Sequence, residues 1–213
     1  DLAHLPGGPA LTGPPFFNSG PAPTRSASWA SGGHEGGGAA VLIGSAYNTS
    51  VSNVHVDGTV SGRARIGGLI GDASGSTTVD GSFANVTVTG SFGNTISFPS
   101  GASNDGSNQS YAVGGLVGNA NGTITVRNSQ ASGAVTGVNQ TGGLVGYTYG
   151  TTTINSSNAS GNVSGTSQVG GLIGYAEGGE AITNSYASGN VTGTSDVGAL
   201  VGAVDAASYA PRT

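Results

Sequence analysis

The stretch GGLVGYTYGTTTINSSNASGNVSGTSQVGGLIG, residues 142–174, contains one full repeat and the start of the next. It opens with Gly-Gly-Leu-Val-Gly at position 142, and a second copy, Gly-Gly-Leu-Ile-Gly, begins at position 170. A fixed period of this size, built from short apolar stretches between Gly, Asn and Ser turns, is typical of a solenoid. Since one such repeat cannot bury its apolar face alone, neighbouring repeats must stack.

Further copies of the five-residue marker extend the repeat in both directions. Copies begin at residues 67, 114, 142 and 170, a variant begins at 198, and a degraded copy, Ala-Val-Leu-Ile-Gly, begins at 40. Successive starting positions therefore differ by 27, 47, 28, 28 and 28. The single long step predicts an insertion, at about 91–110, within a solenoid that covers residues 40–202.

A second marker of twelve residues follows the first one in each repeat. It opens with Val or Ile and closes with Val-(Ser/Thr)-Gly, its sixth position is always small and apolar, and its fifth position varies. This alternation predicts strands with the constant side chain facing inward. The copies are Val51–Gly62, Val79–Gly90, Val126–Gly137, Ile154–Gly165 and Ile182–Gly193.

These patterns predict an all-β protein, and specifically a right-handed parallel β-helix with coils of about 28 residues. The 42 glycines argue against helices, because an interior Gly costs a helix about 1 kcal/mol relative to Ala. Equivalent residues of successive coils should stack inside the solenoid. The clearest expected core column is Leu42, Leu69, Leu116, Leu144, Leu172 and Leu200.

Residues 1–39 differ from the repeats and are expected to form an extended Pro/Gly-rich arm. Of the eight prolines, six lie at or before Pro23, which favours partly polyproline II structure without regular ladder pairing. Large apolar side chains are rare in solvated linkers, so the arm should dock on its own body or on a neighbouring subunit. The docking residues expected are Leu2, Leu5, Leu11, Phe16, Phe17 and Trp29.

The Gly-Leu-(Ile/Val)-Gly core, followed by Asn-Ser-x-Ala-Ser-Gly-x-Val-(Ser/Thr)-Gly, resembles the GLUG-motif repeats. These repeats occur in large bacterial surface and secreted proteins, including filamentous-haemagglutinin-like adhesins. The resemblance covers residues 40–202, most tightly 113–202, where Asn128-Ser129 and Asn184-Ser185 match best. It implies a secreted or cell-surface β-solenoid and brings no catalytic residue with it. The insertion and the degraded first copy depart from the family pattern.

Composition and charge exclude several classes of partner. The net charge is −5, and the five basic residues are scattered arginines, which argues against nucleic acid and anionic membranes. No apolar run is long enough to insert into a membrane, and without cysteine there is no disulfide. The chain begins at Asp1 without Met or a signal pattern, so we expect a secreted product whose leader has been removed.

Candidate chemistry is sparse, and the sequence predicts no catalytic site, cofactor or metal. The histidines lack metal-ligand spacing, and Asp57 and Asp80 are the nearest approach to a carboxylate pair on neighbouring coils. Asn104–Asn108 faintly resembles a calcium loop without its acidic ligands. Thr123–Thr125 and Thr151–Thr153 fit an ice-binding face, whereas the equivalent Glu180–Ile182 does not. The Asn-x-(Ser/Thr) sequons belong to the repeat itself.

The ends of the solenoid carry the functional hypothesis. No capping helix is evident before residue 40 or in the tail at 203–213, although unpaired strand edges normally need a cover. We therefore expect a non-enzymatic extracellular structural protein that stacks head to tail into a filament or surface fibre. The alternative is a cell-surface adhesin module that binds glycans or a receptor through outward aromatic residues. Those residues are Phe83, Tyr147, Tyr175 and Tyr186.

Overall fold

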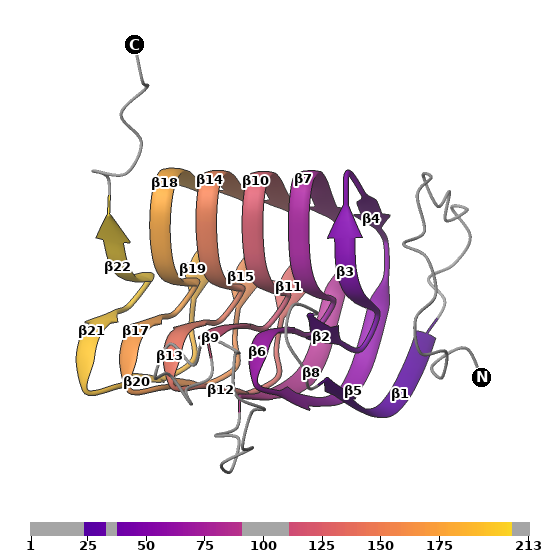
Figure 1. Cartoon of the computed structure of the whole chain (residues 1–213), viewed down its shortest axis with the longest axis horizontal. Coiled ribbons are helices and arrows are strands. Elements are labelled where there is room, and N and C mark those ends of the chain that lie inside the picture. Colours follow the sequence, from indigo (N-terminus) through magenta and orange to yellow (C-terminus); the bar gives the residue numbers. More distant parts are fainter. Residues whose placement is uncertain (1–23, 33–37, 91–110, 206–213) are drawn as a thin grey trace, which may run out of the picture.

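The computed structural model describes residues 24–32, 38–90 and 111–205, and for residues 24–32 it describes the backbone alone. All regular structure in these ranges is β-strand, arranged in three sheets that form the sides of a solenoid (Figure 1). Neighbouring strands run parallel, so the predicted all-β parallel solenoid is confirmed. The described ranges contain no helix of the length and apolarity that a membrane span requires.

The sheets are called A, B and C in the order in which the chain visits them, and their members are as follows. Sheet A contains β1 (Thr24–Gly32), β5 (His55–Gly62), β8 (Phe83–Gly90), β11 (Gln130–Ala131), β12 (Val135–Thr136), β15 (Asn158–Ala159), β16 (Val163–Ser164), β19 (Tyr186–Ala187) and β20 (Val191–Thr192). Sheet B contains β2 (Ala39–Ala40), β6 (Ala64–Gly67), β9 (Tyr111–Gly114), β13 (Asn139–Gly142), β17 (Ser167–Gly170) and β21 (Ser195–Gly198). Sheet C contains β3 (Ile43–Tyr47), β4 (Ser50–Ser52), β7 (Ile70–Asp80), β10 (Val117–Arg127), β14 (Val145–Asn155), β18 (Ile173–Thr183) and β22 (Val201–Asp205).

One turn of the solenoid passes through sheets A, B and C once, and the next turn lies directly on it. Val117 pairs with Val145, which in turn pairs with Ile173, so residues one repeat apart in sequence are neighbours in space. Across the long step, Ile70 pairs with Val117 in the same column. The insertion therefore lies between β8 and β9 without changing the register, although residues 91–110 themselves lie outside the described ranges.

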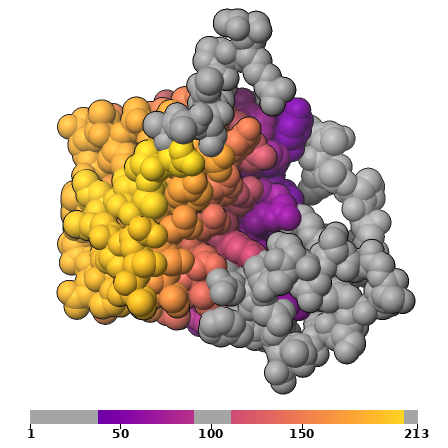
Figure 2. Space-filling model, turned by 60° about the vertical axis from the view of Figure 1, so that its left-hand side comes forward, coloured from indigo at the N-terminus to yellow at the C-terminus, as the bar shows by residue number. Residues whose placement is uncertain are grey.

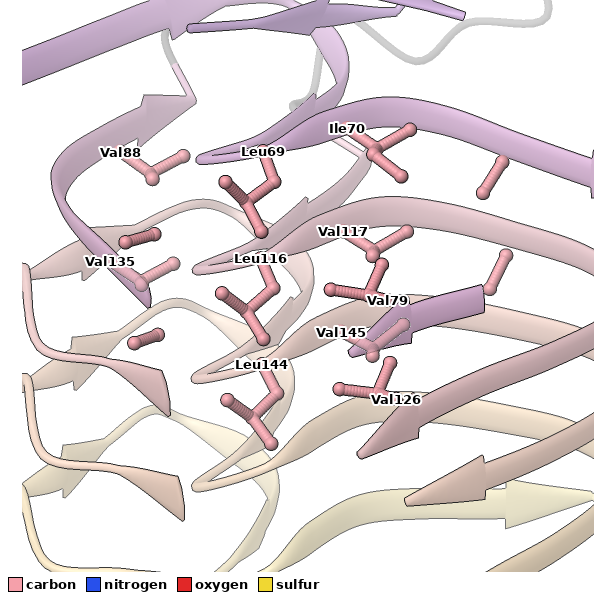
Figure 3. Close-up of a cluster of buried hydrophobic side chains, with 14 of the residues drawn as sticks. Leu69, Ile70, Val79, Val88, Leu116, Val117, Val126, Val135, Leu144 and Val145 are labelled. Carbon is pink, nitrogen blue, oxygen red and sulfur yellow. The ribbon is translucent and has the colours of Figure 1, made fainter. Parts of the chain in front are cut away.

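The core is a set of columns of like residues (Figure 3). Leu69, Leu116, Leu144 and Leu172 follow one another with no exposed surface, and each backbone N–H donates to the carbonyl of the next leucine at 2.8–2.9 Å. At the ends of this column Leu42 is half-buried and Leu200 is 41% exposed. Full burial of a leucine side chain contributes about 1.5–3 kcal/mol, so the interior columns are the main source of stability.

The double glycine of the marker allows the sheets to approach closely. A Cβ on Gly143 would lie 2.1 Å from the carbonyl oxygen of Gly171 and 2.7 Å from the Cβ of Ala159. On the preceding rung, a Cβ on Gly115 would lie 2.1 Å from the carbonyl oxygen of Gly143 and 2.8 Å from the Cβ of Ala131. The small residue at the sixth position of the second marker is therefore the residue that faces this glycine across the core.

The Asn-Ser pair of the second marker forms the corner between sheets C and A. Asn128 and Asn184 adopt positive φ values of 50° and 49°, which Asn tolerates better than most residues. The buried hydroxyl of the following serine, Ser129, donates to the carbonyl of Arg127 at 2.7 Å and accepts from the N–H of Ser82 at 3.1 Å. The same bonds recur on the next rung at Ser157, so a ladder of serines joins the corners.

The structure corrects one expectation about the arm. The prediction that residues 1–39 lack regular ladder pairing is wrong for the segment Thr24–Gly32, because β1 pairs in parallel with β5 of the same chain. Ala39 also belongs to the first strand of sheet B. Of the expected docking residues, Trp29 lies in β1, where only the backbone is described. The others lie outside the described residues: Leu2, Leu5, Leu11, Phe16 and Phe17.

We expect Gly143→Ala to lower the free energy of unfolding by about 1–3 kcal/mol, because the added methyl group overpacks backbone that cannot move aside. The matched control is Gly179→Ala, whose Cβ would meet nothing within 4 Å and whose backbone is not left-handed. Urea unfolding followed by far-ultraviolet circular dichroism measures both variants. Equal stability of the two variants would contradict the close approach between the sheets.

Candidate functional site: the ends and outer faces of the solenoid

The last described rung, at the yellow end of the molecule in Figure 2, exposes side chains that belong to the core columns. Val197, Leu200 and Val204 are 45%, 41% and 60% exposed. Their counterparts one rung inward are Val169, Leu172 and Ala176, which have no exposed surface. Within the described residues, the strands β19 to β22 also pair on one side only. This end therefore combines unpaired backbone with apolar side chains that other rungs bury.

At the opposite end, the edge of sheet A is extended by β1, while β2 and the pair β3 and β4 lie at the edges of sheets B and C. Leu42 and Ile43 are half-buried there. The described strands begin with a member of sheet A and end, at β22, with a member of sheet C. If the solenoid continued beyond β22, its next strand would belong to sheet A. Because β1 is itself a sheet A strand, a second copy placed after β22 would continue the order of the sheets.

The charged residues near the two ends of the solenoid differ in their partners. Arg65, near the start of the repeats, is 2.9 Å from Asp72, whose other carboxylate oxygen accepts from Asn119 at 2.7 Å. At the other end, described acidic residues have no described basic residue on their rungs. These acidic residues are Glu177, Glu180, Asp196 and Asp205. The positive charge of Arg65 is thus already paired within the chain.

The four aromatic residues expected to face outward lie on two different sheets. Phe83 and Tyr186 belong to sheet A, whereas Tyr147 and Tyr175 belong to sheet C. Phe83 is half-buried and makes an edge-to-face contact with His55 at 4.6 Å between ring centroids. Tyr186 is 57% exposed on the last rung of its column. These residues therefore do not make up one continuous binding surface.

Tyr147 and Tyr175 form a stacked pair on the outer face of sheet C. Their ring centroids are 5.6 Å apart with an angle of 26° between the planes, and the Tyr147 hydroxyl donates to Glu177 at 2.7 Å. Burial, and then the hydrogen bond to the Glu177 carboxylate, raise the pKa of Tyr147 above its ordinary value. Two exposed tyrosines that the sequence analysis missed lie on the same sheet. They are Tyr47 and Tyr149, and the spacing of Tyr149 two residues after Tyr147 was the available signal.

The two carboxylates that the sequence analysis placed on neighbouring coils, Asp57 and Asp80, have structural partners and lie on different sheets. Asp57 lies on sheet A, 3.3 Å from His55, and accepts from Asn85 at 3.1 Å. Asp80 lies at the end of β7 in sheet C, 3.1 Å from Arg127. The hydrogen bond from Asn128, together with Arg127, holds the pKa of Asp80 below its ordinary value. Asp57 and Asp80 therefore do not form the carboxylate pair that a glycosidase needs.

Metal chemistry finds no support in the part of the chain that the structure describes. No group of three His, Cys, Asp or Glu side chains there is arranged to hold an ion. The segment Asn104–Asn108 lies outside the described residues, as do His4 and His34.

Comparison with known proteins supports the repeat assignment. The GLUG motif family matches residues 109–136 and 165–192. Each match is as long as one repeat, so one motif corresponds to one full turn through sheets B, C and A. Neither the curated proteins nor the solved structures contain a match to the chain.

The tyrosine pair predicts a pH dependence at the alkaline end. Because the folded-state pKa of Tyr147 is raised, its contribution to stability is complete below about pH 10, the ordinary value, and is lost as the pH rises through the folded-state pKa. An ultraviolet titration should show that the phenolate signal removed by Tyr147→Phe develops above pH 10. Glu177→Gln should move that signal to lower pH. A Tyr147 step at or below pH 10 would contradict the contact with Glu177.

Proposed function

Since the chain is a GLUG-repeat protein folded as a β-solenoid, we propose that its copies stack head to tail into an extracellular filament or surface fibre without enzymatic activity. GLUG repeats occur in secreted surface proteins, and together with the fold they fit an extracellular structural or adhesin-like protein. They also suggest a non-catalytic repeat protein. The observation that carries the finer proposal is the open core of the last described rung, at Val197, Leu200 and Val204.

A second copy matches this end because it offers the same columns in the same order. Continuing sheet C by one rung brings Ile43 of the next copy over Val201, and Ala46 over Val204. Leu42 then follows Leu200 in the leucine column. In sheet A, β1 of the next copy lies against β19 and β20 through the edge that does not pair with its own β5. A contact of this head-to-tail kind does not close on itself and therefore generates a fibre.

The apolar contact can be tested with one charge at the open end. Val204→Arg places a charged group where the next copy would bury Val204, so filaments seen by negative-stain electron microscopy should disappear, leaving single particles. The matched control is Tyr149→Arg, at a 43% exposed position on the middle strand β14, and it should keep the filaments. Uniformly monomeric wild-type particles at high concentration would overturn the proposal.

The register between copies can be tested with a cysteine pair, because the chain has no native cysteine. Ser45 and Ala203 lie on the first and last strands along sheet C, five strand spacings or about 24 Å apart, too far for a disulfide within one chain. Stacking in register brings Ser45 of one copy beside Ala203 of the next. Oxidised Ser45→Cys/Ala203→Cys protein should therefore give a ladder of trimers and larger oligomers on non-reducing gels.

The control pair is Ser45→Cys/Ser160→Cys, because Ser160 is also exposed but lies beside sheet A, one rung inward from the last strands of that sheet. This pair should give no ladder. If the residues after Asp205 cover the open end instead, the Ser45→Cys/Ala203→Cys protein stays monomeric and the thiol introduced at position 203 resists alkylation in the native state. That combination would contradict stacking.

A further inference from the structure

The outer face of sheet C carries two adjacent columns of hydroxyl side chains. Backbone pairing between β7, β10 and β14 places one column along the strands at Ser76, Thr123 and Thr151. The residues two positions later in each strand form the second column, which runs parallel to the first. The first column is exposed and the second is half-buried. The members of the second column are Thr78, Thr125 and Thr153.

These hydroxyl groups have no hydrogen-bond partner within the described part of the chain. Most other hydroxyl groups of the body do have one: Ser129 and Ser157 bond to the corners, and Ser132 bonds to Asn85 on sheet A. Hydration water therefore satisfies these hydroxyl groups, and the positions of the side chains set where that water can bind.

The spacing of the array is set by the backbone. Neighbouring strands are about 4.8 Å apart, and side chains two residues apart on one strand are about 6.7 Å apart. The strands are held in register over ten paired residues, and the inward-facing Thr77, Ile124 and Thr152 between the columns are buried. Threonine is stiff at χ1, so its hydroxyl and methyl groups keep fixed positions. The array is thus a rigid, uncharged lattice.

We propose that this array binds the surface of ice. A ligand that satisfies every hydroxyl group at once must present hydrogen-bonding oxygens that repeat at similar spacings in two directions, and the ice lattice has this property. The threonine methyl groups, between the hydroxyls, limit the number of ways in which surface water can orient. Because the array is preorganised, little side-chain entropy is lost on contact. This proposal is independent of filament formation.

The array ends at β18, and this boundary provides a gain-of-function test. Gly179 and Ala181 occupy the next positions of the two columns, and both are exposed. A Cβ on Gly179 meets nothing within 4 Å and Ala181 is exposed, so we expect Gly179→Thr/Ala181→Thr to add a fourth rung to the array. In an ice-recrystallisation assay, the lowest inhibitory concentration should fall roughly tenfold, equivalent to about 1.4 kcal/mol of added contact. An unchanged concentration would count against the proposal.

The loss-of-function test uses the exposed column. Thr123→Lys/Thr151→Lys places two long, charged side chains on the outer face of sheet C, where they would keep the hydroxyl array from contacting ice. Inhibition of recrystallisation should therefore be lost. The matched control is Thr87→Lys/Thr136→Lys, which makes the same changes at exposed positions of sheet A and should keep full inhibition. Far-ultraviolet circular dichroism verifies the fold of each variant. Wild-type protein without inhibition, or equal loss in both double variants, would overturn the proposal.

Discussion

Parallel pairing in a fixed register is the constraint on which the rest of this molecule depends. It places each residue beside its equivalent in the next repeat, so any contact made once is made again on the next rung. A repeated like-charge contact would therefore be costly, and among the described charges only Glu177 and Asp205, on the last two strands of sheet C, are like-charged register partners. Asp80 meets Arg127 on the next rung, and Asp72 meets Asn119. Only 7% of the residues are charged, which agrees with this constraint.

The same constraint explains why each part of the repeat has its particular residue. Leucine fills the space between the sheets, and the glycine before it leaves room for backbone from the next rung and for an alanine methyl from sheet A. Asparagine turns the corner at positive φ, and the serine after it satisfies a backbone N–H that the corner would otherwise leave buried and unpaired. The residues of the GLUG motif are thus the ones that one turn of the solenoid needs to pack its core and to form its corners.

The columns could be predicted from the sequence because residues one repeat apart become neighbours when the repeats stack. The same reasoning predicted the parallel solenoid and the position of the insertion, but it left the number of sheets open. The corner between sheets B and C is the marker Gly-Gly-Leu itself, which carries no distinct turn signal. The pairing of β1 was missed because prolines dominate the composition before it. Tyr147 and Tyr175 are one repeat apart, so their stacking followed from the period, whereas the bond to Glu177 depends on side-chain rotamers.

The ends differ from the interior because the last side chain of each core column has no neighbouring rung to cover it. Leu172 is fully buried only because Leu200 lies over it, and Leu200 in turn has no equivalent cover among the described residues. Continuing the register places Gly38 and Tyr47 of a next copy over Asp196 and Asp205, so no opposite charge meets these carboxylates in those columns. Selection of the correct partner must then come from the backbone edges and the apolar columns, the same interactions that stack the rungs within one chain.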